Sequence, residues 1–134
     1  MDYGPLVNEE IEAGESLLRK FDEFKPVSVA FWLKGSDDEF RYLFIASDEI
    51  GDGDVRAAYE QIMRLTTATP SVHLDPFRVK VISTGDLRGQ AAILLQSRSD
   101  PSQPIRLVRQ MFGDRYVDDV YVYPRWHTAA ATVR

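Results

Sequence analysis

Residues 27–47 read VSVAFWLKGSDDEFRYLFIAS, and the predicted fold class follows from this pattern. In the first eight residues, apolar side chains occupy both alternating faces, with Val29 and Phe31 on one and Ala30 and Trp32 on the other. The last nine residues alternate in the same way, and the four residues between the two runs are typical of a turn. We therefore predict an antiparallel pair of strands near the centre of a sheet.

Outside this stretch, apolar residues recur at every third or fourth position in three segments, which predicts amphipathic helices. The predicted helices are residues 8–24, 54–68 and 87–97. Alternating or mainly apolar segments predict three more strands. These strands are residues 77–83, 105–112 and 115–123. In the first of them, Phe77, Val79 and Val81 are predicted to face inward. Gly113 and Asp114 separate the last two strands and suit a two-residue hairpin turn with a positive φ at Gly113.

The predicted elements follow the order α-β-β-α-β-α-β-β. This order indicates an α+β fold, with a roughly five-stranded, mainly antiparallel sheet and helices packed on it. At 134 residues the chain has the length of a single domain, which we place at residues 1–126. Residues 127–134 show no patterned face and are expected to form a disordered C-terminal tail.

The composition excludes several classes of function. The chain contains no cysteine, which removes disulfides, thiol catalysis and cysteine-bound zinc or iron–sulfur clusters. Its first residues lack the basic and apolar regions of a secretory signal, and no apolar run approaches the roughly 18 residues that span a bilayer. We therefore expect a soluble cytoplasmic protein with no membrane partner.

Familiar cofactor and metal motifs are absent from the sequence. Gly51 and Gly53 are followed by Arg56 where a dinucleotide-binding fingerprint needs a third glycine. Residues 48–54 carry four carboxylates, but the calcium-loop pattern fails when it is read from Asp52. We predict instead a loop whose aspartates cap the following helix. We expect no cofactor and no metal site, and no motif identifies a catalytic residue.

The charge distribution is the main functional signal. Residues 1–76 contain seven Lys/Arg and sixteen Asp/Glu, a net charge of −9, whereas residues 77–134 contain nine and five, a net charge of +4. The whole chain has a net charge of −5. Such polarity is typical of a surface that meets a charged partner, or of a single domain whose two halves offset each other.

The basic half also interleaves arginine with aromatic residues, which are preferred anchors of protein interfaces. The candidate interaction surface is Arg106, Arg109, Arg115, Tyr121, Tyr123, Arg125 and Trp126. From it we predict a non-catalytic interaction module: a small adaptor, inhibitor or immunity-type partner that binds another protein, with homo-oligomerisation as a further possibility. The same residue types suit single-stranded nucleic acid, an alternative that the overall acidity of the chain disfavours.

Asp118 and Asp119 leave one enzymatic alternative open. They lie in an otherwise apolar strand, and because neighbouring residues point to opposite faces, at most one of them can enter the core. A buried carboxylate needs a partner, for which arginines of the same hairpin are candidates. The functional interpretation is an acid or base beside a tyrosine, in a small-molecule-binding or enzymatic domain. The structural interpretation is an edge-strand charge or a bulge that prevents aggregation.

Overall fold

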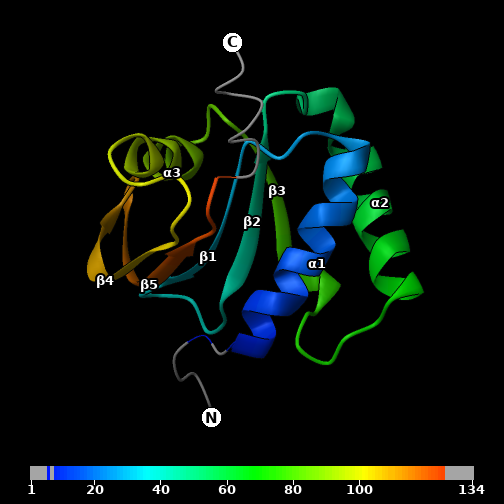
Figure 1. The fold of residues 1–134 in the computed structure, drawn as a ribbon, viewed down its shortest axis with the longest axis horizontal. Helices are drawn as coiled ribbons and strands as arrows, with labels where there is room; N and C mark the ends of the chain where they lie inside the picture. The colour runs from blue at the N-terminus through cyan, green and yellow to red at the C-terminus, as the bar shows by residue number, and fades with distance from the viewer. Residues whose placement is uncertain (1–5, 7, 126–134) are drawn as a thin grey trace.

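The computed structural model describes Leu6 and residues 8–125, which form three α-helices and one five-stranded sheet (Figure 1). The helices are α1 (Asn8–Phe24), α2 (Val55–Ala68) and α3 (Leu87–Ser97). The strands are β1 (Val29–Gly35), β2 (Tyr42–Ser47), β3 (Val79–Ser83), β4 (Ile105–Phe112) and β5 (Arg115–Val122). Short 3-10 helices, η1 (Asp52–Asp54) and η2 (Pro76–Arg78), precede α2 and β3. This confirms the predicted α+β class and order of elements, while the predicted tail at residues 127–134 lies outside the described residues.

The sheet has the strand order β3-β2-β1-β5-β4. β1 pairs antiparallel with β2 on one side and with β5 on the other, and β4 pairs antiparallel with β5. β2 and β3 are parallel, because the chain returns through α2 between them. The sheet is therefore mainly antiparallel. Of the strand pair predicted from residues 27–47, β1 is the central strand of the sheet and β2 lies next to it.

The helices α1 and α2 cover one face of the sheet (Figure 1). Leu18 and Phe21 of α1 are fully buried and belong to one cluster with Trp32 of β1, Ile45 of β2 and Ile62 of α2. A buried side chain of this size contributes about 1.5–3 kcal/mol. The apolar stripes of both helices are therefore what hold them on the sheet.

The helix α3 covers the opposite face. There Phe31 of β1 stacks on Phe44 of β2 with their ring centroids 5.2 Å apart, and meets the edge of Phe112 of β4 at 5.4 Å. Ala92 of α3 belongs to the same buried cluster. β1 and β2 thus bury side chains on both faces of the sheet, as predicted from the apolar residues on both alternating faces of each strand.

The structure corrects the predicted inward position of Phe77, whose side chain is 77% exposed. Phe77 lies in η2, where the Asp75 carboxylate accepts a hydrogen bond from the Phe77 N–H at 2.9 Å. This local bond stabilises a helical turn in place of extended strand. The alternation therefore holds only from the start of β3, where Val79 and Val81 are buried.

The turn between β4 and β5 is the predicted one. Gly113 has a φ of 68°, a backbone conformation that residues with a side chain rarely adopt. A Cβ at this position would also lie 3.2 Å from backbone atoms of Leu87 and Arg88. The hairpin turn therefore packs closely against the start of α3.

Candidate interaction surface

The residues predicted to form one interaction surface lie in different parts of the molecule. Arg106 of β4 and Tyr121 of β5 are opposite one another, with the guanidinium 5.7 Å from the ring centroid, and Tyr121 packs on the α1 side. Arg115 lines a pocket on the α3 side of the sheet. Arg125 follows β5 at the opposite end of that strand from Arg115, and Trp126 lies outside the described residues.

Tyr123 lies in the core, with 3% of its surface exposed, so it cannot contact a partner. Its hydroxyl accepts a hydrogen bond from Trp32 Nε1 at 2.9 Å and donates one to the Ile11 carbonyl at 2.7 Å. Burial raises the pKa of this hydroxyl far above its usual value. The assignment of Tyr123 to the surface was therefore wrong: its amphipathic side chain links the end of β5 to β1 and α1.

A bulge occurs where Asp118 and Asp119 lie in β5. The register between β1 and β5 shifts between Lys34 and Gly35, which leaves Asp118 without a Cα partner in β1. The facing residue of β4, Arg109, has a φ of 48°, in the left-handed region. The predicted bulge is confirmed, but the predicted edge position is wrong, because β5 lies between β1 and β4.

The two carboxylates have different surroundings. Asp119 is 9% exposed and accepts a hydrogen bond from Arg41 Nη2 at 2.8 Å. Its Oδ1 is buried, accepts no hydrogen bond from the described residues and lies 3.7 Å from Arg106 Nε. Asp118 is partly exposed and pairs with Lys34 Nζ at 2.9 Å. The prediction that at most one of the two enters the core is confirmed.

This arrangement is an ion-pair cluster rather than an open acid–base site. Both carboxylates are held by cations at hydrogen-bond distance, and Asp119 is too buried to meet a substrate unless its neighbours move. Sequence reasoning missed Lys34 and Arg41, the nearest partners, because it looked for arginines within the hairpin. The enzymatic alternative gains no support from this geometry and stays a prediction.

The β4–β5 hairpin carries three exposed apolar side chains. Val108, Met111 and Tyr116 are 52%, 60% and 48% exposed. Their chain neighbours pack into the buried cluster beneath α3, so by alternation these three point to the other face of the sheet. Met111 and Tyr116 lie directly opposite one another. We call these three residues, with Arg106 and Arg109 beside them, the hairpin surface.

Asp86 fixes the start of α3 and orients a cation there. Its carboxylate accepts the Arg88 N–H at 2.9 Å and two hydrogen bonds from the Arg88 guanidinium at 3.1 and 3.0 Å. The guanidinium, followed by the backbone N–H, lowers the pKa of Asp86 below its usual value, and Asp86 raises the pKa of Arg88. Arg88 is thereby held in one orientation on the α3 side of the sheet.

Asp86→Ala is expected to lower the free energy of unfolding by about 1 kcal/mol at neutral pH, because α3 loses its N-cap acceptor. The pKa of Asp86 is lowered by folding, so the carboxylate stabilises the fold above its unfolded pKa of about 3.9. That contribution is lost as the pH falls through the lower folded value. Denaturant titrations of both proteins from about pH 7 to about pH 2 check this. A stability difference that stays constant over this range would contradict a charge-dependent contribution.

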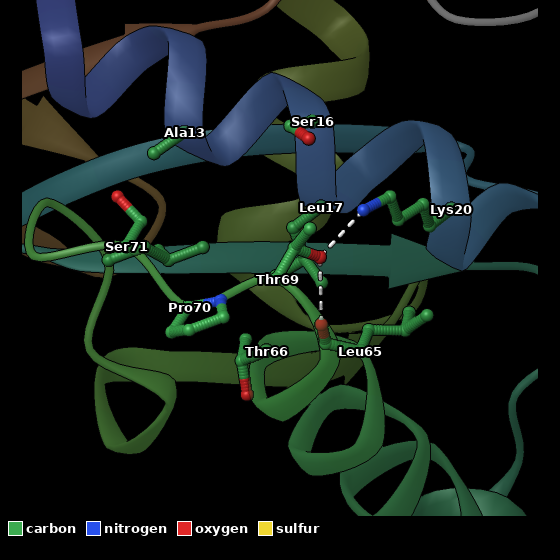
Figure 2. Close-up of a pocket in the computed structure, with 10 residues that line it drawn as sticks. Ala13, Ser16, Leu17, Lys20, Leu65, Thr66, Thr69, Pro70 and Ser71 are labelled. Carbon is green, nitrogen blue, oxygen red and sulfur yellow. Dashed lines mark hydrogen bonds between the residues drawn. The ribbon is translucent and has the colours of Figure 1, made fainter.

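A pocket of about 230 Å³ lies between α1 and the C-terminal end of α2 (Figure 2). Lys20 Nζ of α1 donates a hydrogen bond to Thr69 Oγ1 at 2.7 Å, and Thr69 Oγ1 donates to the Leu65 carbonyl at 3.2 Å. These bonds tie the end of α2 to α1. We interpret this pocket as part of the junction between the two helices, since its lysine already has a partner.

Comparisons of the chain with protein-family models, with curated proteins and with solved structures find no match. Within residues 8–125, no helix has both the length and the apolar composition needed to cross a lipid bilayer. The function is therefore inferred from the surfaces and contacts of the chain alone.

Proposed function

We propose that the protein is a non-catalytic protein–protein interaction module, a small cytoplasmic adaptor, inhibitor or immunity-type partner that binds another protein at the hairpin surface. The observation that carries the proposal is the group of exposed apolar side chains at Val108, Met111 and Tyr116. Side chains of this size lose contact with water when a partner covers them, and this removal of apolar surface from water favours association. Tyrosine, methionine and arginine are also the residue types enriched at interfaces.

The charges beside these side chains define the chemistry of the partner. Arg106 and Arg109 flank Val108 in β4, and both are exposed. Arginines at the rim of an interface favour a partner surface with an apolar centre and acidic side chains around it. The proposed partner is therefore an acidic protein surface with an apolar centre.

The backbone of β4 favours binding through side chains over the addition of a partner strand. β4 is an edge strand that pairs only with β5 in the described sheet, so its outer edge is open. The left-handed φ of Arg109 and the bulge beside it interrupt the regular edge that a partner strand would need. Binding on the exposed side chains avoids this irregular backbone.

The nucleic-acid alternative receives less support. Its arginines do not share one face: Arg106 contacts Tyr121 on the α1 side, whereas Arg115 lines a pocket on the α3 side. A single-stranded nucleic acid needs a continuous track of cations with stacking platforms. Trp126, the remaining predicted platform, lies outside the described residues.

A photo-crosslinking amino acid at Met111 tests the proposal in cells that express the protein naturally. We expect one protein to be captured at this position and not at Met63, a 40% exposed methionine on α2 that serves as the matched control. With the purified partner, Met111→Asp is expected to raise the dissociation constant at least tenfold, about 1.4 kcal/mol. Met63→Asp is expected to leave the dissociation constant unchanged.

Three results would contradict the proposal. Crosslinks to a second copy of the chain alone would make the hairpin surface a homodimer interface. Crosslinks that disappear after nuclease treatment would point to nucleic acid. Equal affinities of Met111→Asp and the wild type for the captured protein would show that the hairpin surface does not carry the interaction.

A further inference from the structure

A second pocket lies on the α3 side of the sheet, with a volume of about 370 Å³. Phe44 and Leu33 of the cluster beneath α3 contribute to its lining, together with Ile82 of β3 and the first turn of α3. A volume near the lower end of the range for ligand pockets suits a small molecule. The hairpin surface lies on the other face of the sheet, so this pocket is separate from the interface proposed above.

Three cations line this pocket. They are Lys80 of β3, Arg88 of α3 and Arg115 of β5, and Asp38 is the single acidic residue among the described lining residues. Lys80 and Arg115 form no ion pair with any residue that the structure describes. Cations gathered in a cleft concentrate the local field and attract anions. The charge of the pocket is therefore not balanced by its own walls.

Two of the three cations, Lys80 and Arg88, are oriented by contacts with neighbouring side chains. Lys80 Nζ lies 5.1 Å from the centroid of the Tyr42 ring, and the Arg88 guanidinium lies 4.7 Å from that of Phe44. Asp86 additionally holds the guanidinium of Arg88 through two hydrogen bonds. Preorganised donors of this kind bind an anion without first losing the conformational entropy of long side chains.

A neutral donor adds to the cations. Tyr59 reaches from α2 to the outer edge of β3, where its hydroxyl oxygen accepts the Val81 N–H at 2.9 Å. The oxygen is thereby used as an acceptor, which leaves its own O–H to donate, and Tyr59 lines the pocket. The pocket thus combines the Lys80 ammonium and the Arg115 guanidinium, which form no ion pair with a described residue, with two further donors. These are the Arg88 guanidinium, which Asp86 holds, and the Tyr59 hydroxyl.

We propose that this pocket is a binding site for a small molecule that carries a phosphate or carboxylate group. The anionic group lies between Lys80 and Arg88, whose cations lie over the rings of Tyr42 and Phe44 in β2, and it forms charge-assisted hydrogen bonds there. Tyr59 and Arg115 supply further donors along the walls of the pocket. A planar part of the ligand stacks on a guanidinium plane. Asp38 at the wall selects against a second anionic group on that side of the ligand.

Phenyl phosphate, benzoate and benzyl alcohol are the probes that test this site, in titrations at low ionic strength followed by backbone amide shifts in NMR spectra. We expect at least one of the two anionic probes to bind with a dissociation constant below about 1 mM, and benzyl alcohol not to bind. The tighter anionic probe identifies the preferred group. The largest shifts are expected at Lys80, Ile82 and Arg88.

Lys80→Gln/Arg115→Gln is the decisive variant, because both side chains are exposed and their replacement leaves the core intact. It is expected to raise the dissociation constant at least about tenfold. Arg98→Gln, at the other end of α3, is the matched control and is expected to bind like the wild type. Failure of both anionic probes to bind below about 1 mM, or unchanged affinity of the double variant, would overturn the proposal. Met111→Asp should leave probe binding intact, so this test does not depend on the hairpin surface.

Discussion

Arg41→Met is expected to lower the free energy of unfolding by about 3 kcal/mol. Methionine keeps much of the aliphatic volume but removes the guanidinium that donates to Asp119 at 2.8 Å. The Asp119 side chain is only 12% exposed, and among the described residues its carboxylate then keeps only Arg106, at 3.7 Å. A carboxylate that has lost its hydrogen-bonded cation in a buried site is strongly destabilising. Urea denaturation followed by circular dichroism measures the change.

Arg56→Met is the matched control for this variant. Arg56 pairs with Glu60 at 3.6 Å, but the arginine is 92% exposed, so its loss is expected to change the stability by less than about 0.5 kcal/mol. Arg41→Met/Asp119→Leu is expected to recover most of the stability, since apolar replacement of both partners of a buried pair is often close to neutral. A loss below about 1 kcal/mol for Arg41→Met, or no recovery in the double variant, would contradict the buried ion pair.

Tyr123→Phe is expected to lower the free energy of unfolding by about 2–3 kcal/mol. The hydroxyl accepts from Trp32 Nε1 and donates to the Ile11 carbonyl, so its removal leaves a buried donor and an acceptor without this partner. Tyr116→Phe removes the same group from a side chain that is 48% exposed, and is expected to cost less than about 0.5 kcal/mol. Denaturation curves for the two variants give the comparison, and equal losses would count against the role of the Tyr123 hydroxyl.

Gly14 allows a sharper test of the same contact. A Cβ at position 14 would overlap the Tyr123 hydroxyl and would lie 3.2 Å from Trp32 Nε1. Gly14→Ala is therefore expected to destabilise the wild type, although alanine favours a helix interior by about 1 kcal/mol over glycine. In the Tyr123→Phe background the overlap with the hydroxyl is gone, so the cost should fall. Additive losses in the double variant would show that position 14 and the hydroxyl do not interact.

The sequence predicted those parts of the fold that depend on local pattern. Residues 27–47 predicted the central strand pair because Phe31 and Trp32 are both apolar yet point to opposite faces, and the structure buries both. The turn at Gly113 was predicted for a similarly local reason, since few residues adopt a positive φ. The inward position of Phe77 was wrong because a hydrogen bond from its N–H to Asp75 competes with strand formation.

The site depended on strand neighbours that no local pattern specifies. Arg41 shares its alternating face with Leu43 and Ile45, which are both buried, but its partner Asp119 comes from β5, beyond the intervening β1. Tyr123 was assigned to a surface because it lies in an arginine-rich segment, whereas a glycine on α1 makes room for its hydroxyl. Hydrophobic periodicity predicts which residues of a strand face the core, but it does not predict which strands become neighbours in the sheet.

The central strand β1 has neighbours at very different distances along the chain. β2 follows it directly, whereas β5 is the last strand of the described fold. Contacts between distant segments form late, because closing a long loop has an entropic cost. During synthesis, one side of β1 therefore stays open until β5 has emerged from the ribosome. A nascent or truncated chain that ends before β5 would present that open edge to other chains, which makes it prone to aggregation.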